Sequence, residues 1–144
     1  MALYDLTSGP VSTTSTNQWQ AVYAETLGAG SVNADNAFRL VADVQAASSA
    51  TVAKVRLSLR GVVFWTLEAV PPQARIVAEI QRVGSTGGRW LVTLEYDTGT
   101  TQGRGQWRGD IATGLNWSQG QELRLEGYGN VSGAVVMRGA GVEK

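Results

Sequence analysis

The sequence predicts an all-β, antiparallel fold of about eight short strands, arranged as a sandwich or barrel. Two observations carry this prediction: polar and apolar residues alternate along several segments, and the 18 glycines concentrate in the connections between those segments. The clearest alternation is in Thr51–Arg60, where Ala53, Val55, Leu57 and Leu59 share one face. The chain has 144 residues, which suits a single domain that buries about two-thirds of the surface of its unfolded form.

The first 18 residues differ in composition from the rest of the chain. Residues 1–18 combine a short apolar head, formed by Leu3, Tyr4 and Leu6, with a Gly-Pro break and a Ser/Thr-rich tract. This composition predicts an extended N-terminal arm, and residues 19–144 are then the β-sandwich domain. The arm has two interpretations, since it could fold back on its own domain or clasp another subunit.

Strands are expected from Trp19 onward. Val62–Leu67 is continuously apolar, which predicts a strand buried on both faces after a break or bulge at Gly61. Ala74–Val83 fits strand alternation better than a helical period. The remaining strands are expected at Trp19–Leu27, Phe38–Gln45, Trp90–Tyr96, Gly105–Ile111, Gln121–Tyr128 and Ala134–Arg138.

The absence of two residue types excludes many mechanisms. The chain has no Cys and no His, so it has no disulfide, thiolate nucleophile, imidazole base or zinc site of the common kinds. A pair of carboxylates is the enzymatic route left open, and Glu79, Glu95, Glu122 and Glu126 lie on predicted strands. Each is expected on a polar strand face as an ordinary surface residue, so we expect no enzymatic activity, no catalytic residue and no cofactor.

Charge and hydropathy narrow the range of partners. Twelve basic and twelve acidic residues give a net charge of zero, and the basic residues are spread singly, so we expect no nucleic-acid partner. No apolar run reaches the roughly 18 to 20 residues that cross a membrane, and no signal-peptide pattern follows Met1, so we also expect no membrane partner.

Two short motifs have simple interpretations. Gly84–Gly88 lacks the Gly-Lys-Ser/Thr ending of a phosphate loop and is predicted to be a hairpin turn. Asn33–Asn36 contains oxygen ligands but one carboxylate alone, so we expect no metal site there.

The five tryptophans divide into two groups. Trp19, Trp65 and Trp90 are predicted to be core residues. Trp107 and Trp117 lie in glycine-rich surroundings and could be core residues, interface anchors or platforms for sugar rings.

Several segments resemble a known group of proteins. TVAKVRLSLRG from Thr51, then RWLVTLEYDTGTTQGRGQWRG, LNWSQGQELRLEGYGN and the final AVVMR resemble the jelly-roll domains of tailed-bacteriophage virion proteins over about residues 50–140. The resemblance implies a jelly-roll sandwich. Within this group, the chain is most similar to capsid decoration proteins, which bind the outside of the assembled shell and stabilise it.

This resemblance implies a set of partners. The main hypothesis is a homotrimer that bridges major capsid protein subunits on the outer surface of the virion, with Leu3, Tyr4, Leu6, Trp107 and Trp117 as its partner-binding residues. Stabilisation would follow from binding the assembled state alone. The alternative hypothesis is a tail-fibre head or minor tail protein that binds a host receptor or carbohydrate.

Overall fold

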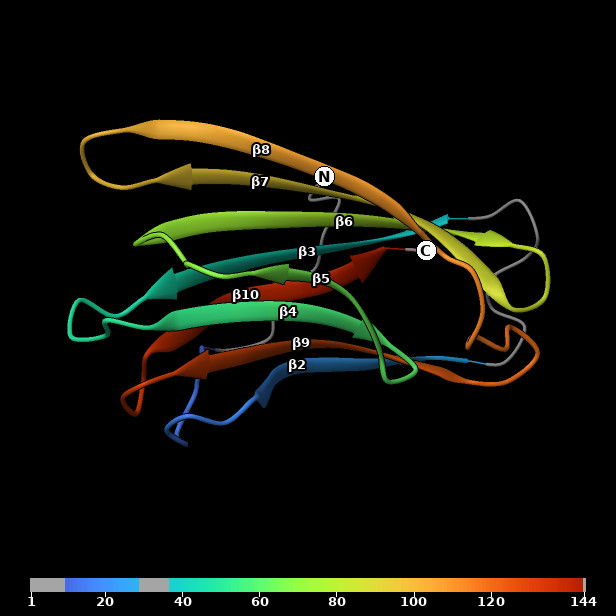
Figure 1. Cartoon of the computed structure of the whole chain (residues 1–144), viewed down its shortest axis with the longest axis horizontal. Coiled ribbons are helices and arrows are strands. Elements are labelled where there is room, and N and C mark those ends of the chain that lie inside the picture. Colours follow the sequence, from blue (N-terminus) through green and yellow to red (C-terminus); the bar gives the residue numbers. More distant parts are fainter. Residues whose placement is uncertain (1–9, 29–36, 144) are drawn as a thin grey trace.

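The computed structural model describes residues 10–28 and 37–143, and this part of the chain is built from strands and their connections (Figure 1). Its strands are β1 (Val11–Ser12), β2 (Gln20–Leu27), β3 (Ala37–Ala46), β4 (Ala53–Leu59), β5 (Val62–Leu67), β6 (Gln73–Val83), β7 (Gly87–Asp97), β8 (Gln102–Ile111), β9 (Gln121–Gly129) and β10 (Val135–Glu143).

The strands form two antiparallel sheets that pack face to face. One sheet has six strands in the order β1-β10-β3-β6-β7-β8, and the other has four in the order β2-β9-β4-β5. Without β7 and β8, the remaining two sets of four strands have the jelly-roll order. The fold is therefore the predicted all-β jelly-roll sandwich, with a β7–β8 hairpin that widens one sheet.

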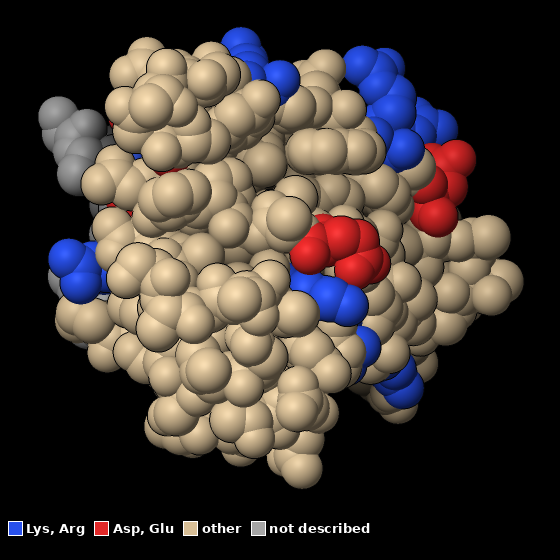
Figure 2. Space-filling view, turned by 60° about the vertical axis from the view of Figure 1, so that its left-hand side comes forward, with Lys and Arg blue, Asp and Glu red and all other residues tan. Residues whose placement is uncertain are grey.

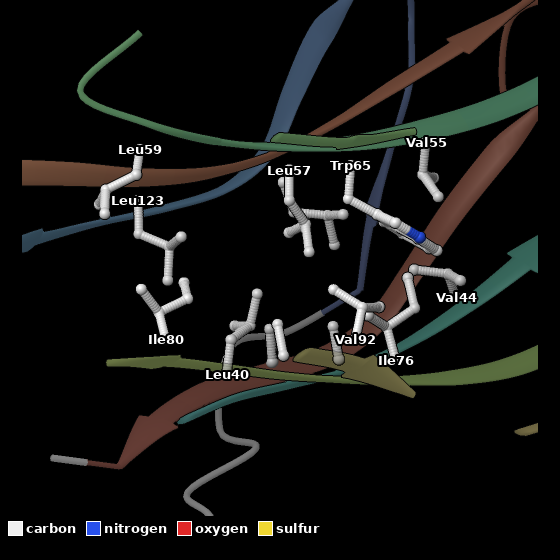
Figure 3. Close-up of a cluster of buried hydrophobic side chains, with 14 of the residues drawn as sticks. Leu40, Val44, Val55, Leu57, Leu59, Trp65, Ile76, Ile80, Val92 and Leu123 are labelled. Carbon is white, nitrogen blue, oxygen red and sulfur yellow. The ribbon is translucent and has the colours of Figure 1, made fainter. Parts of the chain in front are cut away.

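The core lies between the inner faces of the two sheets. Figure 3 shows Leu57, Trp65 and Leu123 of the four-stranded sheet pointing toward Leu40 and Ile80 of the six-stranded sheet. The four leucine and isoleucine side chains are fully buried, and each contributes about 1.5–3 kcal/mol through loss of contact with water. In β4 and β6, the inner face matches the apolar phase of the sequence alternation.

The edges of the sheets account for one wrong prediction. Val62–Leu67 is a strand, but it is not buried on both faces: Trp65 is 5% exposed and Val63 is 44% exposed. The reason is position, because β5 is the edge strand of the four-stranded sheet. Gly61 lies in the β4–β5 turn with Arg60, and both have positive φ, as a tight hairpin turn requires.

The predicted arm is partly integrated into the sandwich. Val11 and Ser12 pair with Met137 and Val136 of β10, and the neighbouring Thr13 is 1% exposed. Residues 11–13 therefore belong to the packed domain, and residues 1–9, with Leu3, Tyr4 and Leu6, lie outside the described residues.

Trp19 is not a core residue, contrary to the prediction. It is half-buried beside the outer face of the four-stranded sheet, with its ring 5.3 Å from that of Tyr128. The Arg56 guanidinium lies 4.2 Å from the Trp19 ring centroid and bonds Glu126 at 2.9 Å. A cation–π contact and an ion pair therefore account for Trp19 at this position.

Glycines on β8 make room for aromatic rings. A Cβ atom at Gly103 would lie 2.3 Å from the Tyr96 ring, and one at Gly109 would lie 2.7 Å from the Trp90 ring. Cross-strand pairing places Gly103 opposite Tyr96 and Gly109 opposite Trp90. The alternating glycines of β8 thus let the large side chains of β7 lie against the β8 backbone.

Replacement of Gly109 by Ala tests this packing. Because the new methyl group overlaps the Trp90 ring, Gly109→Ala should lower the free energy of unfolding by about 1–3 kcal/mol in urea denaturation. Gly28→Ala is the matched control, since nothing lies within 4 Å of a Cβ there, and it should change stability by less than about 0.5 kcal/mol. Equal stability of the two variants would contradict this account of β8.

Candidate functional site

Two open hollows lie on the outer face of the six-stranded sheet, the face turned away from the core. The first hollow has a volume of about 680 Å³ and is lined mainly by polar residues of β3, β6, β7, β8 and β10, namely Asp43, Gln45, Gln73, Arg75, Glu95, Asp97, Gln102, Arg104 and Arg138. The second, of about 550 Å³, is lined by Ala37, Glu79, Gln81, Arg89, Trp90, Leu91, Arg108, Gly109 and Asp110. Both hollows depend on the β7–β8 hairpin for part of their lining.

Cross-strand pairing explains why polar groups converge in the first hollow. Asp43 lies opposite Arg75, Arg75 opposite Glu95, and Glu95 opposite Arg104. Gln73, Asp97 and Gln102 form a second row beside it. Strand pairing fixes the backbone positions from which these side chains extend.

Ion pairs hold several of these side chains in place. Arg75 binds Asp43 through two hydrogen bonds of 2.7 and 3.0 Å, a geometry that fixes the orientation of the guanidinium plane. Arg39 pairs with Glu79 on the same face.

Val41 lies between Arg39 and Asp43 on the outward row of β3. Its side chain is fully buried although it is outside the core cluster between the two sheets.

Three arginines of the same face differ from these pairs. Arg104, Arg108 and Arg138 are exposed, and the described residues provide no ion pair or hydrogen bond for their guanidinium groups. Glu95 is likewise exposed and has no ion-pair partner in the described part of the chain. Asp97 differs, because its carboxylate accepts a 2.7 Å hydrogen bond from the Gly99 amide and stabilises the β7–β8 turn.

The loop end of the sandwich has a different surface. In the view of Figure 2, which brings forward the left-hand side of Figure 1, uncharged residues predominate and charged residues form small separate groups. The connections at that end are rich in Ala, Ser, Thr and Gly, as in 47–51 and 98–101. Polar side chains converge more closely in the first hollow than at this end.

The two tryptophans with open roles occupy different environments. Trp107 is 40% exposed, and its ring lies 5.6 Å from that of Trp65, where the β8 and β5 edges meet. Trp117 is 3% exposed and belongs to the core. Its indole N–H donates a 2.7 Å hydrogen bond to the Gly87 carbonyl, which links the β8–β9 connection to the start of β7. Trp117 is therefore a structural residue in this chain and is not accessible to a partner, whereas Trp107 stays a candidate contact.

The four glutamates that left a carboxylate-pair mechanism open do not converge. Glu122 and Glu126 are on β9 of the four-stranded sheet, and Glu79 and Glu95 are on the six-stranded sheet. Glu79 lies four residues along β6 from Arg75, the cross-strand partner of Glu95, which separates the two glutamates by about 13 Å. The two carboxylates of a glycosidase lie about 5–9.5 Å apart, so none of these pairs has that arrangement.

Other sequence motifs have plain outcomes. The 84–88 segment is a hairpin connection, as predicted, because Val83 pairs with Gly87 across it. Asn33–Asn36 lies outside the described residues. Within residues 10–28 and 37–143, no cluster of acidic side chains has metal-binding geometry, and no helix has the length and hydropathy of a membrane span.

Sequence reasoning missed the outward-facing arginines and glutamines of the six-stranded sheet. The alternation of β3, β6 and β8 does place Arg39, Arg75 and Arg104 on solvent faces. The alternation does not show the order of the strands in the sheet. For example, β10 and β3 are neighbours in space although about 90 residues separate them in the chain.

Comparison with solved structures found three chains that are similar to this one, and two of them are described here. A domain described as the "EclA C-terminal domain; sugar-binding protein" is 11% identical, with 99% of this chain and 83% of that chain covered and a TM-score of 0.46. The CBM2 module of the evolved Dit protein of Lactobacillus casei BL23 phage J-1 is 10% identical, with 96% and 77% covered and a TM-score of 0.44. No family model and no curated protein matches the chain.

Trp117→Phe tests the structural role of the buried indole. The substitution leaves the Gly87 carbonyl without its donor, so the free energy of unfolding should fall by about 1–3 kcal/mol in chemical denaturation. Trp107→Phe is the control, and because Trp107 is 40% exposed it should cost less than about 1 kcal/mol. A smaller loss for Trp117→Phe than for Trp107→Phe would contradict the assignment.

Proposed function

We propose that this protein is a non-catalytic, carbohydrate-binding jelly-roll domain that holds its ligand on the outer face of the six-stranded sheet. The observation that carries the proposal is the first hollow, where amide, carboxylate and guanidinium groups from five strands converge. Such planar groups donate and accept hydrogen bonds in fixed directions, as recognition of many hydroxyl groups requires. A sugar chain presents hydroxyl groups along its length.

The character of the hollow disfavours other ligands. Sites for drug-sized molecules are concave and mostly apolar, whereas this hollow is open and lined by charged and amide side chains. Nucleic acid requires a concentration of positive charge, and here Arg75 and Arg104 alternate with Asp43 and Glu95 across the strands. A hydroxyl-rich ligand suits both features.

This proposal selects one of the two hypotheses drawn from the sequence. A receptor-binding or carbohydrate-binding virion protein needs an exposed polar face, and the six-stranded sheet has one. Of the five residues expected to bridge major capsid protein subunits, Trp117 is buried and Trp107 is 40% exposed, and Leu3, Tyr4 and Leu6 lie outside the described residues. We therefore propose host-surface carbohydrate as the ligand and a virion as the setting.

Paired substitutions on opposite faces test the location of the site. Binding is first detected on an array of bacterial surface polysaccharides and then measured by calorimetry. The double variant Gln73→Ala, Gln102→Ala removes two exposed amides from the first hollow and should weaken binding at least about tenfold, the equivalent of about 1.4 kcal/mol.

The control is the double variant Thr26→Ala, Glu122→Ala, a cross-strand pair on the opposite sheet, which should bind like the wild type. Both double variants should keep the wild-type melting temperature, because all four side chains are exposed. Loss of binding in the control alone would place the site on the other sheet and refute the proposal.

A further inference from the structure

Three arginines on the outer face of the six-stranded sheet have no ion pair with a carboxylate among the described residues. We propose that the ligand is an acidic polysaccharide, one whose repeating unit carries a carboxylate or a phosphodiester group, and that Arg104, Arg108 and Arg138 bind these anionic groups. The inference rests on the proposed carbohydrate-binding function and adds the chemical class of the sugar chain.

The ion pairs of this face show which of its arginines are available to a ligand. Asp43, Glu79 and Asp110 already pair with Arg75, Arg39 and Arg89. The guanidinium groups of Arg104, Arg108 and Arg138 have no such partner among the described residues. An arginine in that state offers planar, two-point hydrogen bonding to a carboxylate or phosphate oxygen pair.

The spacing of the three arginines favours a polymer over a small anion. Arg104 and Arg108 are four residues apart on the same face of β8, which corresponds to about 13 Å. Arg104 on β8 and Arg138 on β10 line the first hollow from strands four positions apart in the sheet, about 19 Å. Sites this far apart do not hold one phosphate together, but they fit charges that recur along a chain.

Glu95 provides an opposing group within the same hollow. It lies directly across from Arg104, without an ion pair between them, and its carboxylate faces the region where the ligand's anion would bind. The Glu95 carboxylate and an anionic group bound at Arg104 would repel each other, so removal of the Glu95 charge should strengthen binding of an acidic ligand. A neutral sugar would instead lose a hydrogen-bond acceptor.

The test compares an acidic polysaccharide with its neutral form. An array carrying carboxylated, phosphodiester-containing and neutral bacterial polysaccharides identifies the strongest binder and the source of its charge. Calorimetry then measures that polysaccharide before and after carboxyl reduction or removal of its phosphodiester groups. Neutralisation should weaken binding at least about tenfold, and raising the salt concentration should weaken binding of the acidic form alone.

Three variants separate charge recognition from general damage to the face. The double variant Arg104→Gln, Arg138→Gln should weaken binding of the acidic form at least about tenfold, and Glu95→Gln should strengthen it about two- to fivefold. Arg124→Gln removes one positive charge from the four-stranded sheet and should have no effect on binding.

Each outcome bears on a specific part of the proposal. The acidic ligand is overturned if the acidic and neutralised forms bind equally and the double variant Arg104→Gln, Arg138→Gln keeps wild-type affinity. Carbohydrate binding remains supported in that case if the double variant Gln73→Ala, Gln102→Ala still binds weakly. Binding of single-stranded DNA as tight as that of the polysaccharide overturns the ligand class. No binding to any polysaccharide overturns both this inference and the proposed function.

Discussion

The pairing of β6 with β7, eleven residues on each strand, is the interaction on which the candidate site depends. The other eight strands form a complete jelly roll without β7 and β8. The pairing of β6 with β7 therefore adds a hairpin to the edge of a complete sandwich. The added hairpin gives the six-stranded sheet a width that the opposite sheet lacks. It also brings Glu95 and Arg104 next to Arg75, which makes the first hollow a feature spanning five strands.

The hairpin has to satisfy both of its faces at once. On its inner face, Trp90 and Tyr96 pack over Gly109 and Gly103, because no larger residue leaves room for those rings. On its outer face, the alternate residues of β8 are free to carry Gln102, Arg104 and Arg108. The glycine-rich appearance of β8 and its polar outer row therefore have one cause, the two-residue period of a strand.

The sequence predicted the fold more completely than the site. Alternation was sufficient to find β4 and β6 and to place Leu57 and Ile76 in the core, since burial follows directly from the strand period. Edge positions were not predictable in the same way: Val62–Leu67 looks like a central strand because its apolar residues do not reveal that β5 has a single neighbour. Trp117 was equally ambiguous, because a glycine-rich neighbourhood does not show whether an indole points inward.

The candidate site depends on long-range pairing, and this is why it could not be read from the sequence. Asp43, Arg75, Glu95 and Arg104 form one row only because β3, β6, β7 and β8 are consecutive in the sheet. In the sequence, tryptophans were the candidates for sugar binding. In the structure, the candidates are arginine, glutamine and acidic side chains on one face of the six-stranded sheet. Trp107 lies at the seam between β5 and β8 and retains the exposure that a further contact would need.

The central claim is that the outer face of the six-stranded sheet binds acidic carbohydrate. Nuclear magnetic resonance spectra of the isotope-labelled protein, recorded during titration with fragments of an acidic polysaccharide, test it most directly. The account predicts that the largest shift changes occur in the side-chain signals of Arg104 and Arg138 and in the amide signals of β7 and β8. Shift changes confined to the four-stranded sheet or to the loop end would contradict it.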